Sequence, residues 1–289
     1  KRKGFFGSIP QAGVTIGMLM ATFIVSLMTL FSEEDFLSWG WRIPFLLSSV
    51  LVILGLWIRK DIDETPDFQK VKKSGQVAKA PLRDTIKHHW REVLIAAGLK
   101  VVETAPFYIF STFVVSYATT TLTYQKSQAL EAVTLGALVA TIMIPLMGLL
   151  SDRVGRQRMY AVSVFVLGLF IVPWFMLLNT GTTWGIVLAT VIAFGVLWAP
   201  VTAVLGTLCS EIFSANVRYT GITLGYQLGA ALAGGTAPLI ATGLLAKYDG
   251  DWVPVAWYLG VTVAISLIAI FCASRINRER HLQAQPEQR

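Results

Sequence analysis

Charged residues are scarce in this chain of 289 residues, because Asp, Glu, Lys and Arg together make up only 14% of it. Ordinary soluble domains carry about 25% charged residues. Hydrophobic residues make up 54% of the chain, and its mean hydropathy is +0.61. The composition therefore excludes an ordinary soluble globular domain.

Cysteine and histidine are also rare, with two and three residues. Cys209 and Cys272 lie in apolar stretches, and His88, His89 and His281 have no Cys or carboxylate at metal-ligand spacing. We therefore expect no disulfide, no metal site and no cofactor. Neither a Walker-type phosphate loop nor a nucleophile elbow occurs, so we expect neither an enzyme nor ATP-driven activity of this chain alone.

Long apolar stretches are what the chain does contain. Eight of them approach or exceed the roughly 17–25 residues that cross a hydrocarbon core about 30 Å thick. The sequence therefore predicts an all-α, multi-pass membrane protein with eight transmembrane helices. The stretches lie near Gly7–Phe31, Trp41–Ile58, Val93–Tyr117, Ala129–Leu150, Met159–Leu178, Trp184–Phe213, Tyr219–Lys247 and Val253–Ser274.

The positions of the basic residues predict the orientation in the membrane. If the amino terminus is cytoplasmic, 20 of the 24 Lys and Arg residues fall in segments on the inner side. The outer loops hold only Arg42, Lys126 and Lys247, and Lys100 lies within an apolar stretch. This is the positive-inside pattern, so we expect both ends of the chain in the cytoplasm. It also explains the net charge of +7 without a nucleic-acid partner.

Small residues and prolines predict where helices pack closely or bend. Gly221, Gly225 and Gly229 repeat every four residues, a spacing that lets helix backbones approach each other. Three proline-containing sites are expected to bend helices around a cavity, with ordinary kinks as the alternative. These sites are Pro145, Pro200 and the Gly234-Gly235 pair with Pro238.

A short charged hairpin joins the fourth and fifth apolar stretches. Its Asp152-Arg153-Val154-Gly155-Arg156 core resembles the cytoplasmic loop signature of the major facilitator superfamily of transporters. Other segments resemble its metabolite:proton symporter family, which includes carriers for shikimate, alpha-ketoglutarate, and proline or betaine. These segments are Arg2–Gln11, Ser38–Leu46, Asp63–Phe68, Glu211–Phe213, Arg218–Gly221 and Gly225–Gln227.

The resemblance implies a carrier built from two bundles of six helices. Residues 1–58 would be the last two helices of the amino-terminal bundle, and residues 93–274 the carboxy-terminal bundle. Residues 59–92 would form the cytoplasmic loop between them, for which a plain linker is the alternative, and residues 275–289 a cytoplasmic tail. The chain begins at Lys1 without an initiator Met, so we expect it to hold the last eight of twelve helices.

Charged residues at the hairpin and beside the sixth stretch predict a cytoplasmic gate. A carboxylate at the membrane boundary can accept charge-assisted hydrogen bonds from neighbouring arginines, and a glycine permits the tight turn. We expect Asp152, Glu211 and Arg218 to form an ionic cluster that closes this side, with purely structural ion pairs as the alternative. The predicted gate residues are Asp152, Arg153, Gly155, Arg156, Glu211 and Arg218.

Lys100 and Glu103 are the leading candidates for a transport site. They lie three residues apart and so share one helix face. If the helix starts near Val93, they lie roughly 10–15 Å deep at about 1.5 Å per residue. Intramembrane charges usually face a cavity or a partner. We expect Lys100 to attract a substrate carboxylate and Glu103 to pair with it or exchange a proton; a Lys100 that reaches the membrane surface is the alternative.

Four further polar or aromatic residues are candidates for the substrate and proton pathway. Tyr226 and Gln227 can offer hydrogen bonds early in the seventh stretch, and Tyr108 and Trp198 can add contacts. Packing, or a place in the interfacial aromatic belt, is the alternative for the aromatic residues.

The resemblance implies proton-coupled symport of an organic acid or a zwitterion by alternating access. A proton-coupled exporter of drugs or metabolites and a non-transporting membrane sensor or scaffold are the alternatives. We expect a monomer in the plasma membrane, the inner membrane of a bacterium, whose partners are a small-molecule substrate, protons and the lipid bilayer.

Overall fold

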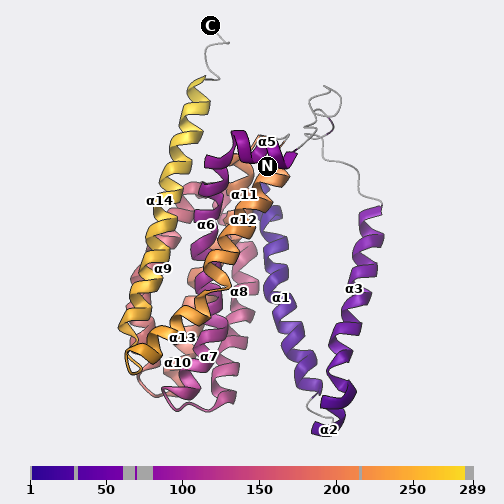
Figure 1. Ribbon diagram of the computed structural model, residues 1–289, viewed down its shortest axis with the longest axis vertical. Helices are drawn as coiled ribbons and strands as arrows, with labels where there is room; N and C mark the ends of the chain where they lie inside the picture. Colours follow the sequence, from indigo (N-terminus) through magenta and orange to yellow (C-terminus); the bar gives the residue numbers. More distant parts are fainter. Residues whose placement is uncertain (1, 29–31, 61–68, 70–80, 215–216, 284–289) are drawn as a thin grey trace.

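Eight helices long and apolar enough to cross a membrane lie within the residues that the computed structural model describes, which are 2–28, 32–60, 69, 81–214 and 217–283. Their number and positions confirm the eight transmembrane helices predicted from hydropathy. Six of them form one bundle, and α1 (Lys3–Met28) and α3 (Arg42–Lys60) lie beside it (Figure 1).

The remaining elements follow in chain order. A short helix, α2 (Glu33–Asp35), links the two flanking helices. The bundle and the segment before it consist of α5 (Pro81–His88), α6 (Trp90–Tyr108), α7 (Val114–Thr120), α8 (Lys126–Val154), α9 (Arg156–Leu178), α10 (Thr183–Thr190), α11 (Trp198–Ile212), α12 (Arg218–Gly229), α13 (Ala237–Lys247) and α14 (Val253–Gln283).

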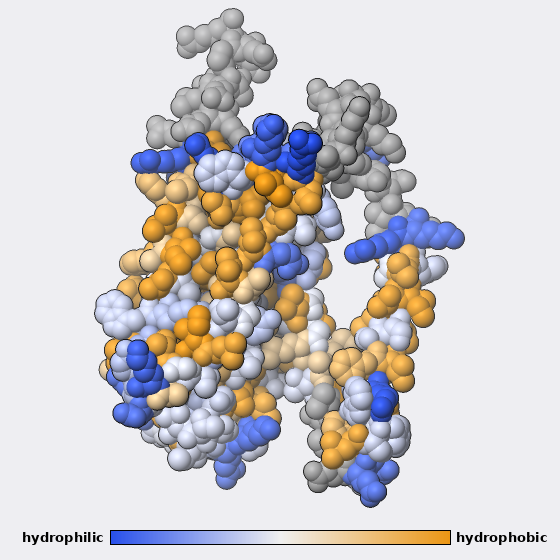
Figure 2. Space-filling view, viewed as in Figure 1, coloured by the Kyte–Doolittle hydropathy of each residue, from blue (hydrophilic) through white to orange (hydrophobic). Residues whose placement is uncertain are grey.

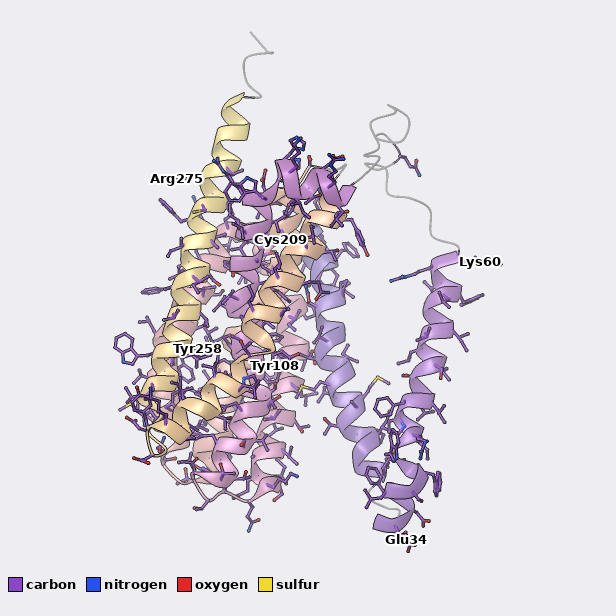
Figure 3. All side chains as sticks on the ribbon, in the orientation of Figure 1. Glu34, Lys60, Tyr108, Cys209, Tyr258 and Arg275 are labelled. Carbon is purple, nitrogen blue, oxygen red and sulfur yellow. The ribbon has the colours of Figure 1, made fainter. Side chains whose placement is uncertain are left out.

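The outer surface of these helices is apolar. Helix α3 has no buried residue, and its large apolar side chains Phe45, Ile53 and Trp57 are each at least 66% exposed. A helix that is apolar on all sides requires lipid or other protein around it. Hydrophilic residues gather at the two ends of the molecule (Figure 2). We call the end that carries Lys60 and Arg275 the basic end (Figure 3).

Four π-helical turns interrupt the α-helical spans of the described residues. Two of them directly precede a proline region: Val191–Leu197 lies before Pro200, and Ala230–Gly234 lies before Pro238. Proline has no N–H group, so the carbonyl four residues earlier loses its helical donor, and a wider turn relieves the resulting crowding. These interruptions agree with the predicted bends. The other two turns are Phe36–Gly40 and Ile109–Phe113.

The structure adds detail to three of the expectations. Helix α8 continues through Pro145 without interruption, because a proline removes one hydrogen bond and neighbouring helices can hold the span. Helix α14 extends beyond Ser274 to Gln283, so the predicted tail begins as helix. The described part of the predicted loop 59–92 contains α5, whereas residues 61–68 and 70–80 lie outside the described residues.

Helix α12 packs closely on α6 through glycines. A Cβ atom at Gly225 would lie 2.5 Å from the Cβ of Ala96. A Cβ atom at Gly229 would lie 2.6 Å from the carbonyl oxygen of Ala97 and 2.7 Å from the Cβ of Lys100. The small-residue spacing read from the sequence therefore brings α12 against the face of α6 that carries Lys100.

We expect Gly229→Ala to lower the stability of the detergent-solubilised protein by about 1–3 kcal/mol, because the added methyl group overlaps the α6 backbone. Gly243→Ala on the neighbouring α13 is the matched control, since a Cβ atom there meets no described atom within 4 Å. Alanine favours helix there, so the control should keep or slightly raise the melting temperature. Equal melting temperatures for the two variants would contradict the close contact.

Candidate functional site

An ion pair between Lys100 and Glu103 lies on α6 inside the bundle. The two side chains are 15% and 9% exposed. Glu103 also accepts hydrogen bonds of 3.0 Å from the hydroxyls of Thr202 and Thr104, one on each carboxylate oxygen. A buried carboxylate needs such partners, since removal from water is costly for a charge. The predicted pairing of the two residues is therefore present, and Thr202 ties it to α11.

Tyr226 covers the lysine. The ammonium nitrogen of Lys100 lies 4.7 Å from the centre of the Tyr226 ring, a distance suited to a cation–π contact. The Tyr226 hydroxyl is buried, and the thiol of Cys209, a weak hydrogen-bonding group, is the polar side chain that it faces. Unsatisfied buried polar groups are rare in proteins. This hydroxyl is available to a ligand.

The amide of Gln11 reaches the same place from α1. A Cβ atom built on Gly206 of α11 would lie 3.6 Å from the amide nitrogen of Gln11 and 3.9 Å from the hydroxyl oxygen of Tyr226. Residues from α1, α6, α11 and α12 therefore converge where the first part of the chain meets the six-helix bundle. Because Gly206 has no side chain, the two polar groups lie beside bare backbone.

The other predicted pathway residues take different positions. The indole of Trp198 donates a 2.7 Å hydrogen bond to the carbonyl oxygen of Glu103 and packs on Phe107, so it positions the α6 backbone. Tyr108 is 38% exposed and lies farther from the basic end than Cys209 (Figure 3). Gln227 is exposed on α12, beside Tyr226 in sequence. Among the predicted pathway residues, Tyr226 contacts the ion pair through its ring.

Sequence reasoning did not identify Thr202, Thr104, Gln11 or Cys209. None of them carries a charge, and Thr and Cys are common in apolar helices. Gln11 gave the one usable signal, since an amide eight residues into a membrane helix needs a partner. Among the described residues, no cluster of His, Cys, Asp or Glu could hold a metal ion.

Asp152 binds the first turn of α1 at the basic end. Its carboxylate accepts hydrogen bonds from the backbone N–H groups of Gly4, at 2.8 Å, and Phe5, at 3.2 Å. These N–H groups have no partner within the helix, and the helix dipole favours a negative charge beside them. The helices approach closely there, because a Cβ atom at Gly148 would lie 2.3 Å from the hydroxyl of Ser8. Asp152 therefore joins α8 to α1.

Arg156 is the cation that connects the predicted gate residues. Its guanidinium lies 3.3 Å from Asp152 and forms a second ion pair with Glu211. Arg218, the cation expected in the cluster, donates a 3.4 Å hydrogen bond to the carbonyl oxygen of Phe213. Arg156 starts α9 directly after the hairpin, so its side chain reaches both carboxylates.

The other two predicted gate residues shape the surroundings. Gly155 has a φ angle of +94°, which allows the abrupt change from α8 to α9. Arg153 is exposed and lines a shallow hollow with Leu146, Leu149 and Leu150, away from the two carboxylates.

The family model described as Major Facilitator Superfamily matches residues 1–234 and, in a second placement, residues 107–289. The chain belongs to the major facilitator superfamily. This membership agrees with the helical fold and identifies a multi-pass membrane protein. No solved structure matches the chain.

Three of the relatives to which the chain is similar are named as transporters. The shikimate transporter of Escherichia coli is 33% identical over 261 residues, covering 89% of this chain and 60% of the relative. The inner membrane metabolite transport protein YhjE of E. coli is 31% identical, covering 93% and 62%. The proline/betaine transporter of Salmonella typhimurium is 31% identical, covering 93% and 55%.

These names confirm the resemblance to the metabolite:proton symporter family and the expectation that the protein is not an enzyme. The chain spans about three fifths of the length of these relatives.

Proposed function

We propose that the protein is a secondary carrier that moves a small organic acid or zwitterion together with protons by alternating access. The observation that carries the proposal is the Lys100–Glu103 ion pair, buried where four helices meet. Shikimate, proline and betaine, after which the relatives are named, all contain a carboxylate. A lysine is a suitable counter-ion for that group.

Each site residue has a proposed task. Lys100 binds the substrate carboxylate, and this contact separates the lysine from Glu103. Glu103 then holds the co-transported proton. Tyr226 positions the lysine with its ring and donates its free hydroxyl to the substrate. Gln11 contributes an amide from the first part of the chain, so substrate binding is sensitive to the relative position of the two parts.

The contact of Asp152 with α1 acts as the gate. While it is formed, α1 and α8 are held together at the basic end and that end is closed. The distribution of Lys and Arg supports a cytoplasmic location for this end. Alternating access requires the contact to break when the two bundles rock.

Reconstitution of the protein into proteoliposomes tests the function. Counterflow of radiolabelled shikimate and proline should exceed that of empty liposomes for at least one of them, and an inward proton gradient should drive accumulation. Counterflow without a response to the gradient would contradict proton coupling. Net efflux against the gradient would favour the exporter, and no flux of any carboxylate would favour a sensor.

Tyr226→Phe should weaken substrate binding in the same assay by roughly tenfold, because it removes one hydrogen bond of about 1–1.5 kcal/mol. The variant keeps the ring over Lys100, and the lost hydroxyl has no hydrogen bond among the described residues. Its melting temperature should therefore stay within about 2 °C of the original protein. An unchanged substrate concentration for half-maximal uptake would show that the hydroxyl does not contact the substrate.

A further inference from the structure

A groove of about 330 Å³ lies between α9 and α14. Its deeper part is apolar, and Phe271 on its wall is 57% exposed. Its other end is polar and lies at the basic end. The lining residues are Gln157, Arg158, Ala161, Leu267, Ile270, Phe271 and Ser274.

Two arginines stand at the polar end of the groove. Arg158 lines it and is exposed. Arg275 lies near the end of α14 (Figure 3), with its guanidinium carbon 4.6 Å from the centre of the Phe271 ring. Between them, the Ser274 hydroxyl donates a 3.2 Å hydrogen bond to the Gln157 side chain. Neither guanidinium has a carboxylate within 4 Å among the described side chains.

The chemistry of the two ends selects the ligand. Lipid tails are as apolar as leucine, so the apolar part accepts an acyl chain but favours no particular lipid. The guanidinium groups supply the preference, because their planar N–H donors match phosphate oxygens in pairs. Two cations beside a membrane surface favour an anionic lipid over a zwitterionic one by roughly 30-fold at low salt.

We propose that this groove is a binding site for one anionic phospholipid. The phosphate lies between Arg158 and Arg275, and one acyl chain lies along Ala161 and Phe271. The bound lipid links the start of α9 to the end of α14. This site is separate from the transport site, and its test does not depend on transport.

Native mass spectrometry of the protein in mild detergent tests the site. Titration with phosphatidylglycerol should show one tightly bound lipid per chain, and phosphatidylcholine should bind roughly 30-fold more weakly. Arg158→Gln with Arg275→Gln should remove that preference. Arg91→Gln is the matched control, because Arg91 is exposed and stacks on Trp90 at 5.4 Å without lining the groove. Arg91→Gln should leave the affinity for phosphatidylglycerol within about threefold of that of the original protein.

A second variant separates the groove from surface charge. Ala161→Phe fills the apolar part and keeps both arginines, so it should also remove the tight lipid, with helicity by circular dichroism confirming the fold. Retention of the lipid by Ala161→Phe or by the double arginine variant would overturn the proposal. So would equal competition by soluble glycerophosphoglycerol, which would identify a site for free anions.

Discussion

Lys100→Ala should raise the substrate concentration for half-maximal uptake by at least roughly 30-fold. Truncation of one member of a buried charge pair costs about 2–5 kcal/mol, and here it removes the proposed counter-ion of the substrate carboxylate. Radiolabelled uptake into proteoliposomes measures this change. Lys247→Ala is the matched control, because Lys247 is exposed and lies 5.4 Å over the Tyr248 ring; it should leave uptake unchanged.

A second substitution separates binding from folding. Lys100→Ala leaves the Glu103 charge buried without its cation, which should destabilise the protein by about 3–5 kcal/mol. Adding Glu103→Gln removes that charge. The amide oxygen can keep the hydrogen bond from Thr202, and the amide NH2 group can donate to the hydroxyl oxygen of Thr104, which also donates to the Lys100 carbonyl. The double variant should therefore regain most of its melting temperature but not its uptake. Recovery of both would show that the pair serves the fold alone.

Asp152→Asn should open the basic end and slow transport by about tenfold. Asp152 accepts charge-assisted hydrogen bonds from the N–H groups of Gly4 and Phe5 on its two oxygens, each worth about 1.5–3 kcal/mol. The single amide oxygen of Asn can keep only one of them, as a weaker neutral bond. The substitution also removes the charge that pairs with Arg156. The closed state should therefore lose population while insertion into the membrane stays intact.

Labelling of a cysteine at position 8 measures the opening. Ser8 is fully buried between α1 and α8, so Ser8→Cys in a background without Cys209 and Cys272 should react slowly with a soluble maleimide. Asp152→Asn should speed this reaction by about tenfold. Glu131→Gln, an exposed carboxylate near the start of the same helix, is the control and should have no effect. Unchanged labelling and uptake in Asp152→Asn would reject the gate.

The candidate transport site was only partly predictable. Lys100 and Glu103 were identified because a charge in an apolar stretch is costly and therefore informative. Thr202 and Gln11 carry no charge, so nothing local distinguishes them from packing residues. Their role depends on distances across the bundle.

The gate shows a related limit. The sequence predicted an ionic cluster of Asp152, Glu211 and Arg218, whereas the geometry identifies Arg156 as the cation that contacts both carboxylates. The contact with α1 could not be predicted from side chains, because the partners are the backbone N–H groups of Gly4 and Phe5. Helix termini carry partial charge whatever residues form them.

Hydropathy along the chain was sufficient to predict the membrane environment and the eight spans, because each span must satisfy its own backbone hydrogen bonds in lipid. Motifs in the same sequence were sufficient to predict the superfamily. Tertiary structure alone decided which polar groups meet at Lys100, which arginine bridges the carboxylates and where a groove opens between α9 and α14. The physical reason is that apolar helix faces in lipid look alike in sequence, so partner choice rests on packing between distant residues.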